Sequence, residues 1–253
     1  MSTHDTQDVF SQAMNLQYLR PASLDRAKVV DDLKARFEWP VEYEFNQEFY
    51  ELFNDFGEKR HIIRWPREIL HKDPKFEDYM RDLVCALFAE QYHPQFAIPA
   101  FTRHTDPSHI ERFKPIFRYA ADWFIDAELR RLCPPVMDDE IDNEFKHAWA
   151  VLRNRPPAAG LDFTVLTGLV LAEALLYRNM RIEVTGVLSH VMGCYLRTPP
   201  DKPSRFTLQS LVKSLFALVA PNFTAHLIRE RNYEHWEISQ LKVPPPKPEL
   251  GSL

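Results

Sequence analysis

The segment from Ala89 to His93, Ala-Glu-Gln-Tyr-His, has a spacing that could carry metal chemistry. In the helical motif HExxH of zinc hydrolases, two histidines four residues apart bind the ion, and the glutamate polarises the attacking water. Here Glu90 stands at the place of the glutamate and His93 at that of the second histidine, whereas Ala89 offers only a methyl group. The segment therefore predicts a general base and one zinc ligand in a degenerate AExxH motif.

A third ligand is expected from Asp122, in the segment RYAADWFIDAEL. If the helices on either side of Thr105–Ser108 are antiparallel, Asp122 lies level with His93. Asp122 also shares one helical face with Arg118 and Asp126 at spacings of four residues. The same spacing is equally typical of a solvated row of ion pairs.

The segments HIIRWPREIL, AEQYH and RYAADWFIDAEL together resemble the zincin-like metallopeptidase domains found beside von Willebrand factor A-like domains. The resemblance covers about residues 60 to 133, and Arg118 and Asp126 stand where that family usually has asparagines. The matching residues are Trp65 and Pro66 in a turn, Glu90 and His93 in the active-site helix, and Ala120, Asp122 and Ile125 in the later segment.

The resemblance implies hydrolysis of peptide bonds in a peptide or protein substrate, if the zinc site is intact. Glu90 would be the general base, and His93 and Asp122 would be zinc ligands. It also implies a partner ATPase of the AAA type, of the MoxR kind. Two protein ligands rarely hold zinc at intracellular concentrations. The chain is therefore expected to be inactive as written, a pseudoenzyme.

Three explanations are open for Ala89. The protein is a natural pseudoenzyme that uses the fold for binding, or the histidine was replaced deliberately, or another histidine completes the site from a loop. The histidines that could do so are His61, His104 and His109. We favour either of the first two explanations over the third.

Two alternative functions are open. One is a helical protein–protein interaction or adaptor module without catalysis. The other is a di-iron carboxylate protein, because four-helix di-iron sites use two Glu-x-x-His pairs and two further carboxylates. The candidate iron ligands are the pairs Glu90/His93 and Glu144/His147, with Asp122 and either Glu48 or Glu51. The turn at Cys133–Pro135 lies midway between Asp122 and Glu144, which predicts that these two carboxylates are level.

The composition of the 253 residues is typical of a globular protein, with 45% hydrophobic and 26% charged residues. The net charge of −5 argues against nucleic-acid binding. The polar N-terminus does not resemble a signal peptide, and the longest apolar run, 163–177, contains Glu173 and is too short to cross a bilayer. The three cysteines form no CxxC motif. We expect a cytoplasmic protein with no membrane contact.

Hydrophobic periodicity predicts a mainly α protein with a small β element, ending in an all-helical region. The resemblance implies that the part before this region is a zincin-like helical core. Strands are expected at VEYEF and HIIRW. Helices are expected at 6–19, 23–37 with Ser23 as N-cap, 73–93, 106–133, 138–154, 163–180, 182–196 and from 206 onward. The predicted division is a zincin-like domain at 1–154, a helical domain at 161–241 and a disordered tail at 242–253.

Overall fold

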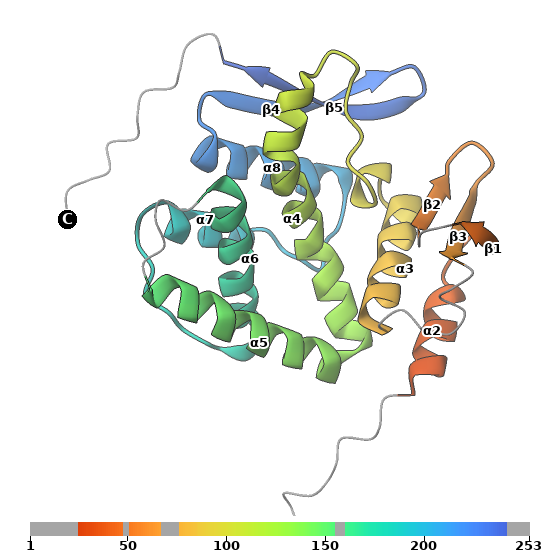
Figure 1. The fold of residues 1–253 in the computed structure, drawn as a ribbon, viewed down its shortest axis with the longest axis horizontal. Coiled ribbons are helices and arrows are strands. Elements are labelled where there is room, and N and C mark those ends of the chain that lie inside the picture. The colour runs from red at the N-terminus through yellow and green to blue at the C-terminus, as the bar shows by residue number, and fades with distance from the viewer. Residues whose placement is uncertain (1–24, 48–50, 67–75, 155–159, 242–253) are drawn as a thin grey trace, which may run out of the picture.

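The computed structural model describes residues 25–47, 51–66, 76–154 and 160–241 (Figure 1). The predicted helix at 6–19, the Ser23 cap, Glu48, most of the 155–160 linker and the 242–253 tail lie outside these ranges. The elements are α2 Arg26–Lys34, β1 Val41–Gln47, β2 Glu51–Asp55, β3 Arg60–Pro66, α3 Phe76–Gln91, η3 Pro94–Phe96, α4 Pro107–Leu132, α5 Pro134–Arg153, α6 Leu161–Arg178, α7 Gly186–Arg197, α8 Arg205–Val219, β4 Phe223–Glu230 and β5 Tyr233–Gln240.

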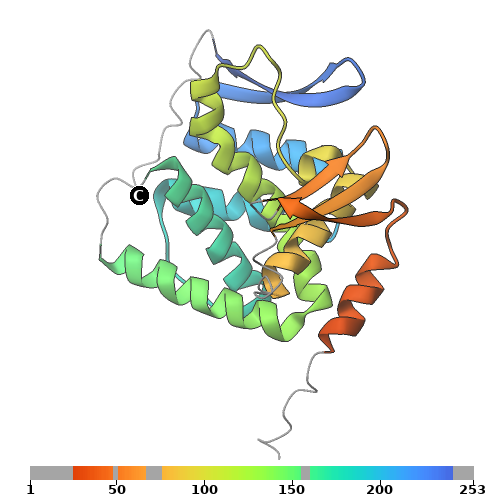
Figure 2. The ribbon, with the colours of Figure 1, turned by 45° about the vertical axis from the view of Figure 1, so that its right-hand side comes forward.

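The predicted fold class, mainly helical with a small β element, is confirmed. The strands predicted at VEYEF and HIIRW are β1 and β3. These two strands are parallel neighbours, and β2 pairs antiparallel with β3 to complete a three-stranded sheet of order β1-β3-β2. The sheet lies at one side of the helical body, next to α3 (Figures 1 and 2).

The helix α3 ends at Gln91, although periodicity predicted it to continue through His93. The physical reason is Pro94, because proline excludes the helical conformation of the residue before it. His93 is accordingly extended, with φ −170° and ψ 138°, and caps the short helix η3. The face of α3 that carries Glu90 therefore does not extend to His93.

The long helix α4 begins where its cap predicts. The side chain of Asp106 accepts a hydrogen bond from the backbone N–H of Ser108, and Pro107 occupies the first turn. Its C-terminal end meets Pro134, which opens α5 as the next helix. In Figure 1, α4 runs through the middle of the molecule and α5 crosses its lower end.

The C-terminal region is not all-helical, and this expectation is corrected by a β-hairpin. Strands β4 and β5 pair antiparallel from Phe223 opposite Gln240 to Glu230 opposite Tyr233. A two-residue turn at Arg231 and Asn232 joins them, and Arg231 has a positive φ of 59°. The hairpin was missed because its alternation of apolar and polar residues follows directly on the apolar face of α8.

The hairpin lies over α8 and the first turns of α4 (Figures 1 and 2). Its anchor is Trp236, 1% exposed, whose ring centroid lies 4.9 Å from that of Phe117. The backbone of Trp236 also exchanges hydrogen bonds with Ala100 and Thr102, at 2.8 and 2.9 Å. The hairpin is therefore fixed to the segment that connects α3 to α4.

One continuous hydrophobic core runs from Leu33 in α2 to Ile238 in β5. Helix α6 packs against both α4 and α5, across the predicted domain boundary at 155–160. Helices α6 and α7 approach so closely at Gly168 that an added Cβ would lie 2.4 Å from a methyl carbon of Val191. Within the described residues, every helix is too short or too polar to cross a membrane.

Candidate functional site

The carboxylate of Glu90 is buried at the end of α3, with its side chain 2% exposed. It accepts hydrogen bonds from the backbone N–H groups of Glu38, at 2.6 Å, and Trp39, at 3.3 Å. A third hydrogen bond, 2.9 Å long, joins it to Nε2 of His61 in β3. Glu90 thus ties α3 to the sheet and to the segment before β1, and its oxygens face these donors.

His61 is fully buried and lies between Glu90 and Asn54, whose side-chain amide is 2.7 Å from Nδ1. The ring of Trp39 stacks on the imidazole at 5.3 Å, and Phe37 meets its edge at 5.1 Å. Burial lowers the pKa of His61 and outweighs the opposing effect of Glu90. Nε2 of the ring faces a carboxylate oxygen of Glu90, and Nδ1 faces the side-chain oxygen Oδ1 of Asn54, so both ring nitrogens lie against oxygen acceptors.

His93 belongs to a different network. Its Nε2 lies 2.9 Å from the carboxylate of Glu234 in β5, and its Nδ1 accepts the backbone N–H of Gln95 at 3.4 Å. Glu234 also accepts two hydrogen bonds from the guanidinium of Arg205. Burial lowers the pKa of His93. The second predicted zinc ligand therefore links the α3–α4 connection to the hairpin.

The other two histidines considered as substitute ligands lie near the start of α4. His104 accepts a hydrogen bond from Arg103 at 3.2 Å, and the ring of His109 packs 4.9 Å from that of Phe223. Both positions are more than three helical turns from Asp122 along the chain. The structure does not bring them to the predicted site.

The third predicted ligand, Asp122, lies in a cluster of charged side chains. Oδ1 of Asp122 is 3.8 Å from the guanidinium of Arg81 in α3, and Oδ2 is 3.7 Å from that of Arg118. Arg81 also pairs with Asp126 at 2.5 Å and with Glu140 at 3.4 Å. The predicted face of Arg118, Asp122 and Asp126 exists, but Asp126 is only 7% exposed, so it is not a solvated row.

These side chains line a cavity of about 260 Å³ between α3, α4, α5 and α6, here named the acidic cavity. Its polar lining residues are Asp78, Arg81, Arg118, Tyr119, Asp122, Asp126, Glu140, Glu144 and Glu173, and its apolar ones are Met137, Ile141, Leu166 and Leu169. Asp122 and Glu144 lie in the same cavity, as the midway position of the Cys133–Pro135 turn predicted.

Several carboxyl groups of the acidic cavity hold protons more tightly than usual. Burial, together with the neighbouring Asp126, raises the pKa of Asp122 to about 7. Partial burial, with Glu140 and Asp126 nearby, raises the pKa of Glu144 to about 7, although Glu144 as a whole residue is exposed and water screens these effects. The pKa of Glu173, which is 4% exposed, is raised well above its usual value by burial. Near neutral pH the cavity is therefore partly protonated.

The residues of α3 that interact with Asp122 are Arg81 and Cys85, one turn apart on the helix. Asp122 lies within ion-pair distance of Arg81, and its charge raises the pKa of the Cys85 thiol, after burial, which is the largest cause. Arg81 and Cys85 are four residues apart, and Asp82 follows Arg81. The segment Arg-Asp-Leu-Val-Cys thus has the spacing of HExxH, with an acid at the second place and a thiol at the fifth.

The three residues predicted to act at a zinc site are not positioned to bind one zinc ion together. Glu90, His93 and Asp122 lie in three separate hydrogen-bond and ion-pair networks, each with its own partners. Ala89 is 2% exposed and belongs to the core. In the described part of the chain, no group of three or more histidine, cysteine, aspartate or glutamate side chains is placed to hold a metal ion.

The predicted iron ligands divide in the same way. Glu144 and Asp122 share the acidic cavity, whereas Glu90 and His93 lie elsewhere and His147 is exposed on α5. Of the two remaining candidates, Glu51 is in β2 and Glu48 is outside the described residues. The two Glu-x-x-His pairs therefore do not converge on one site.

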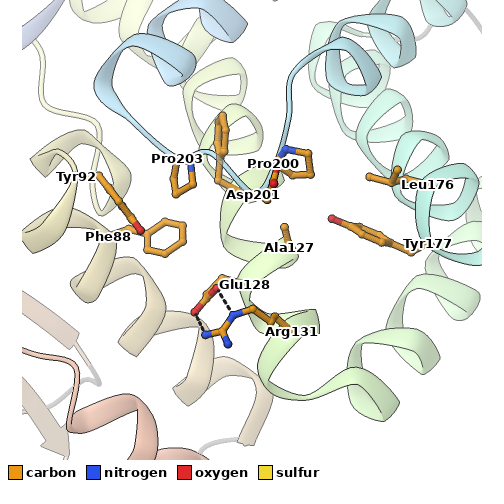
Figure 3. Close-up of a pocket in the computed structure, with 11 residues that line it drawn as sticks. Phe88, Tyr92, Ala127, Glu128, Arg131, Leu176, Tyr177, Pro200, Asp201 and Pro203 are labelled. Carbon is orange, nitrogen blue, oxygen red and sulfur yellow. Dashed lines mark hydrogen bonds and ion pairs between the residues drawn. The ribbon is translucent and has the colours of Figure 1, made fainter.

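A larger groove of about 600 Å³ lies between α3, α4, α6 and the connection from α7 to α8 (Figure 3). Phe88 and Tyr92 form one wall, Leu176 and Tyr177 face them, and an ion pair of Glu128 and Arg131 lies at one end. Its other lining residues are Phe124, Ala127, Pro200, Asp201 and Pro203. Sequence reasoning missed this groove, because its walls come from four separate segments.

Comparisons with protein-family models, with curated proteins and with solved structures returned no significant match for this chain.

Proposed function

We propose that this chain is a metallopeptidase-like protein that acts by binding and not by hydrolysis. The observation that supports the proposal is the position of Arg81, whose guanidinium lies between Asp122 and Asp126. In the zincin-like resemblance, a metal ion lies between the active-site helix and the aspartate of the later segment. Here a permanent organic cation lies between α3 and that aspartate.

The chemistry of the two cations differs in a way that matters for catalysis. A zinc ion keeps an open coordination position for water and lowers the pKa of that water. A guanidinium has only N–H donors and does not lose its proton in proteins. Arg81 can hold Asp122 and Asp126 in place, but it cannot activate a water molecule for attack on a peptide bond.

The test is zinc content by elemental analysis on three versions of the full chain. We expect no bound zinc in the natural chain and none in Ala89→His, because position 89 is buried in the hydrophobic core, and Glu90 and His93 beside it have other partners. We expect up to one zinc per chain in the double variant Arg81→His, Cys85→His, which places two imidazoles opposite Asp122. The same double variant with Asp122→Asn is the matched control, and it should lose the zinc.

Two results would contradict the proposal. Stoichiometric zinc in the natural chain would mean that the site is complete as written. Zinc in Ala89→His but not in the double variant would place the metal site at residues 89–93 and would make peptide hydrolysis by the restored chain the better proposal.

A second candidate function is an adaptor that binds a protein partner, and the groove of Figure 3 favours it. Tyr92 and Leu176 are 40% and 46% exposed at its walls, so apolar surface is available to a peptide segment. The resemblance points to an ATPase of the MoxR type as the partner. Binding of such a purified ATPase should be lost in Tyr92→Ser, Leu176→Ser and kept in Phe206→Ser, an equally apolar change at a 72% exposed residue outside the groove.

A further inference from the structure

We propose that the acidic cavity binds a small aliphatic diamine, whose two ammonium groups pair with Asp122, Glu144 and Glu173. The proposal names a ligand class for the proposed binding function, and it rests on that function in one respect: Arg81, not a metal ion, is the resident cation of the cavity.

The charge of the cavity is unbalanced. Six carboxyl groups line it, from Asp78, Asp122, Asp126, Glu140, Glu144 and Glu173, against the two guanidinium groups of Arg81 and Arg118. The side chain of Arg118 is 71% exposed, and Asp78 and Glu144 are exposed as well, so water screens these three charges. The more buried carboxyl groups, those of Asp122, Asp126 and Glu173, then face Arg81 as the less exposed of the two lining cations. Some of these carboxyl groups are protonated near neutral pH, and a bound ammonium would take the place of their protons as the compensating positive charge.

Glu173 gives a second, independent reason. It belongs to α6, is 4% exposed and lines the cavity. Its Oε1 atom has no hydrogen-bond partner among the residues that the structure describes. A buried carboxyl oxygen without a donor is costly and unusual in folded proteins. An N–H group of a bound ammonium would provide the missing donor.

The spread of the carboxyl groups favours a ligand with two charges over a single metal ion. Asp122 and Asp126 are four residues apart on α4, as are Glu140 and Glu144 on α5, which corresponds to about 6 Å along a helix axis. In the described ranges, no three of these groups are placed to hold one metal ion. A four-carbon diamine carries its two ammonium groups at a similar separation.

The rest of the lining suits the hydrocarbon part of such a ligand. Four apolar side chains, Met137, Ile141, Leu166 and Leu169, come from α5 and α6. They can contact the methylene groups while the carboxyl groups contact the nitrogens. The volume of about 260 Å³ is enough for a short chain and too small for a peptide.

The experiment is isothermal titration of the full chain with 1,4-diaminobutane at constant ionic strength, compared with n-butylamine. We expect saturable binding of one diamine per chain and at least tenfold weaker binding of the monoamine. Glu173→Gln and Glu144→Gln should each weaken diamine binding at least tenfold. Glu111→Gln, the same charge change on the exposed side of α4, is the control and should bind like the natural chain.

The titration results either support the diamine proposal or overturn it. No saturable binding, equal affinity for the two amines, or the same loss in Glu111→Gln would overturn it. Circular dichroism checks that each variant is folded. If Glu173→Gln does not fold, Glu144→Gln, at an exposed position, carries the test. Zinc is measured on the same samples. Bound zinc in the natural chain contradicts the proposed function, whereas a zinc-free chain that ignores the diamine contradicts only this inference.

Discussion

Replacement of Arg81 by methionine should destabilise the protein strongly, and more at high pH than at low pH. The change keeps an unbranched apolar side chain and removes the guanidinium that pairs with Asp122, Asp126 and Glu140. Removing one partner of a buried ion pair costs about 3–5 kcal/mol, because the other charge stays buried and unpaired. The side chain of Arg81 is 28% exposed, so we expect the lower figure, about 3 kcal/mol, at pH 8.

The pH dependence distinguishes an ion-pair effect from lost packing. The carboxyl groups left by Arg81 can take up protons, which relieves their repulsion at a gain of about 1.4 kcal/mol for each pH unit and group. At pH 6, below the raised pKa of about 7 of Asp122, the variant should therefore lose only about 1 kcal/mol. Loss of packing alone would cost the same at both pH values.

The assay is urea unfolding at pH 8 and pH 6, followed by the fluorescence of the buried Trp123 and Trp236. The matched control is Arg118→Met, which removes a guanidinium 3.7 Å from Asp122 at a 71% exposed position and should cost less than about 0.5 kcal/mol. The reasoning is refuted if Arg81→Met costs no more than Arg118→Met at pH 8, or if its cost does not fall at pH 6.

Three further predictions concern other parts of the fold. The free energy of unfolding of the natural chain, measured relative to that of Asp122→Asn, should fall by about 1 kcal/mol from pH 6.5 to pH 8. A carboxyl whose folded pKa is raised to about 7 stabilises the fold fully only below its unfolded pKa and loses that contribution as pH rises through 7. The comparison with Asp122→Asn cancels the opposite contribution of the histidines with lowered pKa, and equal pH profiles of the two chains would contradict the prediction. Gly168→Ala should cost about 1–3 kcal/mol in urea unfolding, because the new Cβ would lie 2.4 Å from Val191, and Val191→Ala should recover part of the loss. Glu90→Gln should cost about 1–3 kcal/mol, because its amide N–H₂ would face N–H donors, and the Nε2–H signal of His61 should shift in the NMR spectrum; an unchanged signal would argue against this contact.

Much of the fold follows from local sequence. The 3.6-residue periodicity of apolar side chains predicts the helices of the described residues to within a few positions, and Asp106-Pro107 predicts the start of α4. The short turn at Pro134 predicts that Asp122 and Glu144 come to one site, because a tight connection keeps the start of α5 beside the end of α4, and both residues line the acidic cavity. These features depend on a few neighbouring residues, which the sequence displays directly.

The axial offset between α3 and α4 could not be predicted in this way. The connection between them spans residues 92–106 and contains η3 and the contacts to the hairpin, so its length does not set which turn of α3 faces Asp122. Sequence spacing alone favoured residues 89–93, whereas Arg81 and Cys85 are the α3 residues that interact with Asp122 in the fold. Helical periodicity defines a face and not a height along the axis.

The sequence by itself therefore determined the helices, the strands β1 and β3 and the residues that share each helical face, because these depend on local periodicity and capping. Only the tertiary structure decided that Glu90 pairs with His61 in β3, that His93 pairs with Glu234 in β5, and that four helices enclose the acidic cavity. Each of these contacts joins residues that are far apart in the chain. Packing of the whole core, and not any local pattern, fixes their distances.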